Sequence, residues 1–186
     1  MMGRLIFLIG APNCGKSTLG RRVAELMQLP FYDTDEMVRA KIGETRLFDA
    51  FSSYAQVRFQ KEQRNAVFSL TDLIDPAIVA TGAEIALIPV CVDAMRNAGY
   101  IIHIKRNIES VLEEVRSSAN KRTVLVEVNN GTIFDFREQA VLAYADDLPN
   151  YEAVADFTLE NNGSEDDGIK LLRAIIQAKM LIEDDS

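Results

Sequence analysis

The chain has 186 residues, 48% of them hydrophobic, and its 20 basic and 28 acidic residues give a formal net charge of -8 at pH 7. This length can bury one sizeable core, and the negative charge argues against a protein that grips nucleic acid. Cys14 and Cys91 lie far apart without ligand neighbours, which indicates neither a disulfide framework nor a zinc site and favours a reducing cytoplasm.

A short apolar run at the N-terminus, Arg4 to Ile9, leads directly into a glycine-rich stretch. This arrangement favours a buried strand over a signal peptide, because no cleavage site follows the run. No other run approaches the roughly 20 apolar residues of a membrane span, so no membrane partner is expected.

Apolar runs and amphipathic stretches alternate along the chain, which is typical of β-α units around a mostly parallel sheet. Residues 16–27 carry apolar side chains at helical spacing, so a helix is expected to begin directly at the glycine-rich stretch. Asn107 and Ser164 are placed as N-caps of two later helices. The expected strands are Arg4 to Ile9, Pro30 to Tyr32, Ala77 to Ala80, Tyr100 to Ile104 and Phe157 to Leu159.

Residues 117–134 do not follow this alternation. The segment is polar, contains Lys121 and Arg122 without a clear period, and predicts a turn at Asn129-Asn130-Gly131. It is interpreted either as a lid over a ligand or as an ordinary surface loop.

The glycine-rich stretch has the pattern of a P-loop, Gly10-x-x-x-x-Gly15-Lys16-Ser17, between a strand and a helix. Backbone amides of such a loop surround phosphate oxygens, the lysine neutralises the outer phosphates and the serine hydroxyl ligates magnesium. We therefore expect a nucleoside triphosphate and Mg2+ here, with Cys14 as a small filler whose oxidation or alkylation is a secondary hypothesis. The expected nucleotide-binding residues are Gly10, Asn13, Cys14, Gly15, Lys16, Ser17 and Thr18.

Asp33-Thr34-Asp35 follows the second expected strand, at the edge where parallel strands form a ligand crevice. Alternation along an extended segment would point both carboxylates the same way. One would then hold magnesium through water while the other accepts the proton of an attacking hydroxyl. The alternative is that an Asp caps the helix that begins near Glu36.

These motifs, followed by Arg58 and by Ile78-Val79-Ala80-Thr81-Gly82, resemble the successive signatures of the shikimate kinase family. Arg116, Arg122 and the segment Pro149-x-Tyr151 extend the resemblance over nearly the whole chain. It implies one P-loop kinase domain over residues 1–186, with a five-stranded parallel sheet of order 2-3-1-4-5. It also implies an acceptor-binding region at about 34–62 and a lid at about 117–134.

The resemblance further implies magnesium-dependent transfer of the terminal phosphoryl group of ATP to a hydroxyl of shikimate. Lys16 and Ser17 would serve ATP and magnesium, with Asp33 in the metal shell. For the acceptor, the implied residues are Asp35 at the hydroxyl, Arg58 at the carboxylate and Gly82 in the pocket wall. For the nucleotide, they are Arg116 at adenine and Arg122 at the transferring phosphates, which adds Arg122 to the catalytic residues Lys16 and Asp35.

Three acceptor-side residues depart from the family pattern. Ala83 and Glu84 replace two glycines, and Asp147 stands where the family has a second carboxylate-binding arginine. Either another arginine, Arg137 or Arg64, substitutes for the missing one, or the acceptor is a different cyclitol or an amine-bearing acid. A catalytically silent nucleotide-binding or regulatory protein is the alternative of another class.

His103 is the one histidine of the chain and is expected in the core. The chain is expected to be a monomer.

Overall fold

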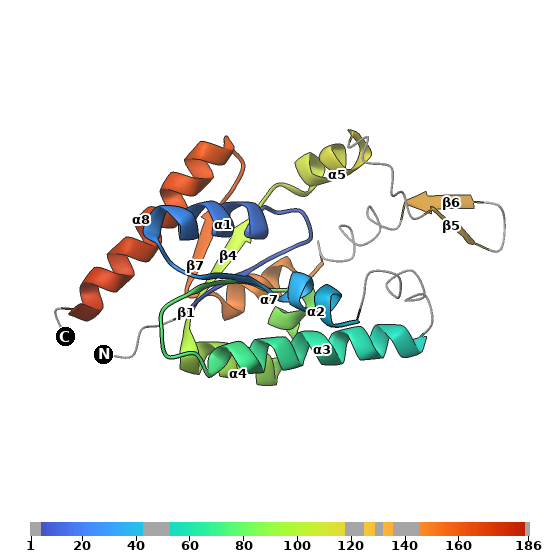
Figure 1. Ribbon diagram of the computed structural model, residues 1–186. Coiled ribbons are helices and arrows are strands. Elements are labelled where there is room, and N and C mark those ends of the chain that lie inside the picture. The colour runs from blue at the N-terminus through green and yellow to red at the C-terminus, as the bar shows by residue number, and fades with distance from the viewer. Residues whose placement is uncertain (1–4, 43–52, 118–124, 129–131, 136–145, 185–186) are drawn as a thin grey trace.

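The computed structural model describes residues 5–42, 53–117, 125–128, 132–135 and 146–184. Its centre is a parallel sheet of order β2-β3-β1-β4-β7, so the expected order 2-3-1-4-5 is confirmed (Figure 1). The strands of this sheet are β1 (Leu5–Ile9), β2 (Phe31–Asp33), β3 (Ile78–Ala80), β4 (Gly99–Lys105) and β7 (Phe157–Glu160). The helices are α1 (Lys16–Met27), α2 (Thr34–Ile42), α3 (Ser53–Thr71), η3 (Ala83–Leu87, 3-10), α4 (Pro89–Ala98), α5 (Ile108–Ser117), α7 (Leu148–Val154) and α8 (Glu165–Asp184).

Helices cover both faces of the sheet because its central strand is apolar on both sides. Every residue of β1 is buried. Leu5, Phe7 and Ile9 pack with α3, α4 and α7, whereas Ile6 and Leu8 pack with α1 and α8. Figure 1 shows the same division, with α1 and α8 on one face and α3, α4 and α7 on the other. A continuous apolar run is what a central parallel strand requires.

Helix α1 lies close to the sheet because it carries a glycine on its inner face. A Cβ added at Gly20 would lie 2.7 Å from Leu8 Cδ1 and 2.8 Å from Phe31 Cε2. The helix begins at Lys16 and ends at Met27, as expected, and Gln28 closes it in the left-handed conformation. The approach of α1 fixes the glycine-rich loop above the end of β1.

The two expected caps are both present. Asn107 Oδ1 accepts a hydrogen bond from the Glu109 amide at 2.8 Å, before α5. Ser164 Oγ accepts one from the Asp167 amide at 3.2 Å, before α8. Such caps satisfy amides that a helix start leaves without an internal partner.

A two-stranded antiparallel sheet occupies part of the segment that was interpreted as a lid or loop. Strands β5 (Leu125–Val128) and β6 (Thr132–Asp135) pair with each other. The sequence analysis did not predict this hairpin, because only its turn residues 129–131 gave a signal, and they lie outside the described residues. No helix in the described part of the chain has the length and apolar character needed to cross a membrane.

Candidate active site

The candidate site lies at the carboxyl edge of the sheet. All five parallel strands lead into it: β1 into the glycine-rich loop, β2 into α2, β3 into Gly82, β4 into Arg106 and β7 into Asn161. All the strands are parallel, so these segments meet at one edge although they are far apart in sequence.

The glycine-rich loop requires two glycines by its geometry. Gly10 and Gly15 have φ values of 139° and 105°, in the region that favours glycine. A Cβ at Gly10 would lie 2.5 Å from the Ile104 carbonyl oxygen, and one at Gly15 would lie 2.6 Å from Asn161 Nδ2. Gly15 is the N-cap of α1, and neither a side-chain cap nor an acidic residue occupies the first turn. The positive end of α1 therefore faces the loop without an acidic residue in its own first turn.

Lys16 is held against the loop by its side chain. Its Nζ donates to the carbonyl oxygens of Gly10 at 2.9 Å and Ala11 at 2.8 Å, and it is 9% exposed. Cys14 is 1% exposed and packs with the α1 and α8 core, as its interpretation as a filler requires. The same burial hinders a reagent from reaching its thiol.

A cavity of about 370 Å³ opens beside this loop. Arg106 and Asn161 line it in addition to the expected loop residues, and Asn161 Nδ2 donates to the Cys14 carbonyl at 2.9 Å. Sequence reasoning missed both residues. The sequence could have indicated them only by position, because Arg106 directly follows β4 and Asn161 directly follows β7. The full lining is Asn13, Gly15, Lys16, Ser17, Thr18, Leu19, Arg106, Asn161, Gly163 and Glu165.

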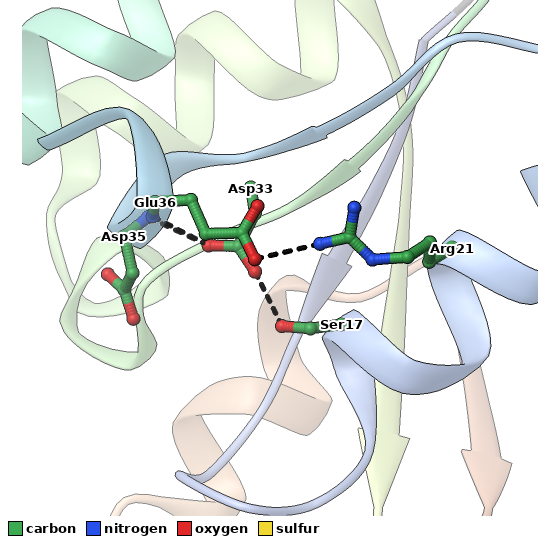
Figure 2. A network of polar contacts seen from close by, with 5 residues as sticks. All are labelled: Ser17, Arg21, Asp33, Asp35 and Glu36. Carbon is green, nitrogen blue, oxygen red and sulfur yellow. Dashed lines mark hydrogen bonds and ion pairs between the residues drawn. The ribbon is translucent and has the colours of Figure 1, made fainter. Parts of the chain in front are cut away.

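Asp33 links the loop to α2 through both of its carboxylate oxygens. Ser17 Oγ donates to Oδ2 at 2.6 Å, while Oδ1 accepts from the amides of Asp35 at 2.9 Å and Glu36 at 3.1 Å. Figure 2 shows this carboxylate between the start of α1 and the start of α2. Asp33 therefore caps α2, as the alternative interpretation expected, and its other oxygen accepts from the P-loop serine. Its place in a magnesium shell stays a prediction.

Asp35 does not point the same way as Asp33, so the expectation from strand alternation was wrong. Strand β2 ends at Asp33 and α2 begins at Thr34, which makes Asp35 a helical residue. Figure 2 shows its carboxylate directed away from Asp33 and Ser17. Its Oδ1 accepts a hydrogen bond of 2.6 Å from Gln63 Nε2 on α3.

The turn after β3 brings Gly82 to the same place. The Gly82 amide donates to Thr34 Oγ1 at 2.9 Å, and a Cβ at Gly82 would lie 2.8 Å from Asp35 Oδ1. Two residues further on, Glu84 Oε2 accepts a hydrogen bond of 2.8 Å from Gln60 Nε2. This cluster, where the sequence predicts the acceptor, thus combines two carboxylates with two carboxamides of α3.

Arg58 lies on a different side of α3. It precedes Gln60 by two residues and Gln63 by five, which rotates it about 160° and 140° from them around the helix axis. Its side chain is exposed. The pKa of Glu62 is lowered chiefly by its hydrogen bond with Lys41, and the charge of Arg58 adds to this effect. The structure therefore groups Arg58 with Glu62 and Lys41.

The other candidate residues for binding the acceptor carboxylate lie apart from this cluster or outside the described residues. Burial raises the pKa of the Cys91 thiol on α4, and the charge of Arg64 partly offsets this. Asp147 lines a groove of about 410 Å³ with Asp93 and Arg96, between α4 and α7. Arg122 and Arg137 are outside the described residues, as is the side chain of Arg116 at the end of α5.

His103 belongs to the core, as expected. It is fully buried on β4, with its ring centroid 5.3 Å from that of Tyr151. Neither ring nitrogen has a hydrogen-bond partner among the described residues. Burial lowers the pKa of His103 to about 4, so the ring is neutral near pH 7.

Comparison with known proteins gives concordant matches. The family model of shikimate kinase matches residues 12–178. A curated shikimate kinase of Buchnera aphidicola subsp. Baizongia pistaciae is 29% identical over 161 residues, 86% of this chain and 87% of the relative. A solved shikimate kinase from Acinetobacter baumannii, in complex with shikimate, has a TM-score of 0.72 at 26% identity and 95% coverage of each chain. A gluconokinase from Sinorhizobium meliloti 1021, with a TM-score of 0.64 at 14% identity, covers 100% of this chain and 98% of its own and shows the fold alone.

Proposed function

The chain belongs to the shikimate kinase family, and on this premise we propose that it transfers the terminal phosphoryl group of ATP to a ring hydroxyl of shikimate. The products are shikimate 3-phosphate and ADP. Membership makes the chain a small-molecule phosphotransferase with a hydroxyl acceptor. The Acinetobacter baumannii relative, solved with shikimate, supports this acceptor.

The observation that carries the proposal is the 2.6 Å hydrogen bond between Ser17 Oγ and Asp33 Oδ2. It joins the phosphate loop to the helix start that bears Asp35. A phosphate-binding loop alone is common to switches and ATPases. Its direct connection to a turn with a second carboxylate, beside Gly82, favours transfer to a bound acceptor.

Magnesium fits the residues beside the loop. Mg2+ prefers oxygen ligands and is usually held by one or two carboxylates together with substrate phosphates, which matches Ser17 and Asp33. Within the described ranges, no group of three or more His, Cys, Asp or Glu side chains could hold a metal without the nucleotide. When bound, the ion supplies neutralisation of phosphate charge, and Ser17 and Asp33 would hold it.

The chain's own residues would then position the two substrates. Lys16 exchanges its two carbonyl acceptors for phosphate oxygens, and the amides of the loop surround the remaining ones. Asp35 holds the acceptor hydroxyl and takes its proton as the oxygen bonds to the terminal phosphorus. The bond from that phosphorus to ADP breaks at the same time. Arg116 at adenine and Arg122 at the transferring phosphates are part of this proposal.

A second candidate acceptor is favoured by the residues that α3 presents beside Asp35. Gln60 and Gln63 occupy that side, and Gln60 pairs with Glu84. In the part of the chain that the structure describes, no arginine forms an ion pair with Asp35 or Glu84. A carboxylate here attracts an ammonium group and repels another carboxylate, so a neutral cyclitol or an amine-bearing acid is the alternative.

A coupled assay of ADP release with shikimate, quinate, aminated analogues and small cyclitols tests both acceptors. The expected result is shikimate-dependent release that Asp35→Asn lowers about 100-fold to 10,000-fold while ADP binding persists. Turnover of a cyclitol or an aminated acid without turnover of shikimate would select the second candidate. Unchanged turnover in Asp35→Asn would refute the role of Asp35.

A further inference from the structure

We propose that Gln63 is a positioning residue that fixes the carboxylate of Asp35 for proton acceptance. The inference rests on the proposed function, because it concerns the same hydroxyl. It assigns a role to Gln63, a residue of α3 that belongs to none of the motifs identified in the sequence.

The contact between the two side chains is partly buried and charge-assisted. Gln63 is 5% exposed, and its Nε2 donates to Asp35 Oδ1 at 2.6 Å. Hydrogen bonds to an ionised carboxylate are about twice as strong as those between neutral groups. A buried glutamine also loses rotamer freedom, so this contact has to offset an entropic cost. Gln63 is therefore held in one arrangement with Asp35.

Gly82 provides the space for this arrangement. A Cβ at Gly82 would lie 2.1 Å from Gln63 Nε2 and 2.8 Å from Asp35 Oδ1. The backbone of Gly82 is itself fixed by its hydrogen bond to Thr34 Oγ1, and Thr34 is fully buried. Any side chain at this position would displace the carboxamide from Asp35.

The hydrogen bond leaves the two oxygens of Asp35 in different situations. Oδ1 is occupied by Gln63, whereas Oδ2 has no hydrogen bond from any described residue. With Oδ1 held, the carboxylate does not rotate, and Oδ2 remains for the acceptor hydroxyl and its proton. A base has to lie within hydrogen-bond reach of the proton that it takes, and displacement by about 1 Å can cost about 100-fold in rate.

The decisive variant is Gln63→Met, which keeps a long side chain and removes the donor. We expect kcat to fall about 10-fold to 100-fold, with the KM of the acceptor changed less than about twofold. In the Asp35→Asn background the same substitution should cost less than about twofold, because Gln63 acts through Asp35. Asn65→Ala, on the exposed side of α3, is the matched control and should leave both constants unchanged.

Two further variants separate positioning from packing. Gln63→Glu keeps the size of the side chain but places a second carboxylate against Asp35, and like charges repel. Its loss of kcat should therefore be at least as large as that of Gln63→Met, although it fills the same space. Gly82→Ala should reproduce the loss of kcat, because it displaces the same carboxamide.

The outcomes distinguish this inference from the proposed function. An active wild type that tolerates Gln63→Met overturns the inference and leaves the function standing. A rise in acceptor KM without loss of kcat also overturns it, since that result makes Gln63 a direct ligand. A wild type that transfers phosphate to no acceptor refutes the function. If no acceptor is found, the hydrogen bond between Gln63 and Asp35 can still be tested without an activity assay. The measurement is the chemical shift of the Gln63 side-chain amide in a 15N NMR spectrum. These signals should shift in Asp35→Asn, and an absence of any shift overturns the inference.

Discussion

Lowering the pH should destabilise the fold through His103. Burial is the main cause of its lowered pKa of about 4, against an ordinary value of 6.5. The charge of Glu152 opposes this effect, as does that of Glu160, whereas Lys105 and Lys16 add to it. The unfolded chain therefore binds a proton on this ring at a higher pH than the folded chain does, and stability falls as the pH drops from 6.5 toward 4.

The size of the effect follows from the two pKa values. At about pH 5 the unfolded state gains about 2 kcal/mol from protonating this ring, and below the folded value of about 4 the full gain is about 3 kcal/mol. Above the ordinary value of 6.5 the ring is neutral in both states, so His103 contributes no pH dependence there.

Urea unfolding of the wild type and of His103→Leu, followed by circular dichroism at about pH 7.5 and about pH 5, tests this reasoning. Carboxylates titrate in both proteins, so the comparison isolates the ring. The wild type should lose about 2 kcal/mol more than the variant between the two pH values. Equal losses in the two proteins would refute the argument from burial.

Two other substitutions test contacts around the nucleotide site. Asn161→Ala removes the side chain that donates a hydrogen bond to the Cys14 carbonyl. The variant should bind ADP about fivefold more weakly in titration calorimetry. Unchanged affinity would mean that the loop keeps its shape without this contact. Gly20→Ala pushes a methyl group against Leu8 and Phe31 and should lower the free energy of unfolding by about 1 to 3 kcal/mol in urea titrations, despite the better helix propensity of alanine. A stabilised Gly20→Ala protein would contradict the close packing of α1.

The sheet and the donor side were predictable because their signals are local. An apolar run followed by a P-loop pattern specifies a strand, a turn and a helix start within about 20 residues. The strand order itself came from the resemblance to a family, since the alternation of elements indicates a parallel sheet without its order. The hairpin β5-β6 was missed because short strands outside the main sheet carry little periodic signal.

The acceptor side was less predictable because it depends on which face of a helix meets another element. Arg58 and Gln63 lie five residues apart on α3, and nothing local in the sequence decides which of them faces Asp35. The direction of Asp35 depended on where β2 ends, and a difference of one residue there changes the direction of the side chain. Asn161 contacts Cys14 across 147 positions, which no short motif could indicate.

The carboxylate of Asp33 physically connects the P-loop with the start of α2. One of its oxygens meets Ser17 and the other meets the amides that begin α2, the helix that bears Asp35. We expect a nucleotide that displaces Ser17 to shift the start of α2 through this carboxylate. By linkage, the acceptor must change nucleotide affinity by the same factor as nucleotide changes acceptor affinity. Asp33, a residue that was expected to serve the donor alone, would then give each proposed substrate a means of sensing the other.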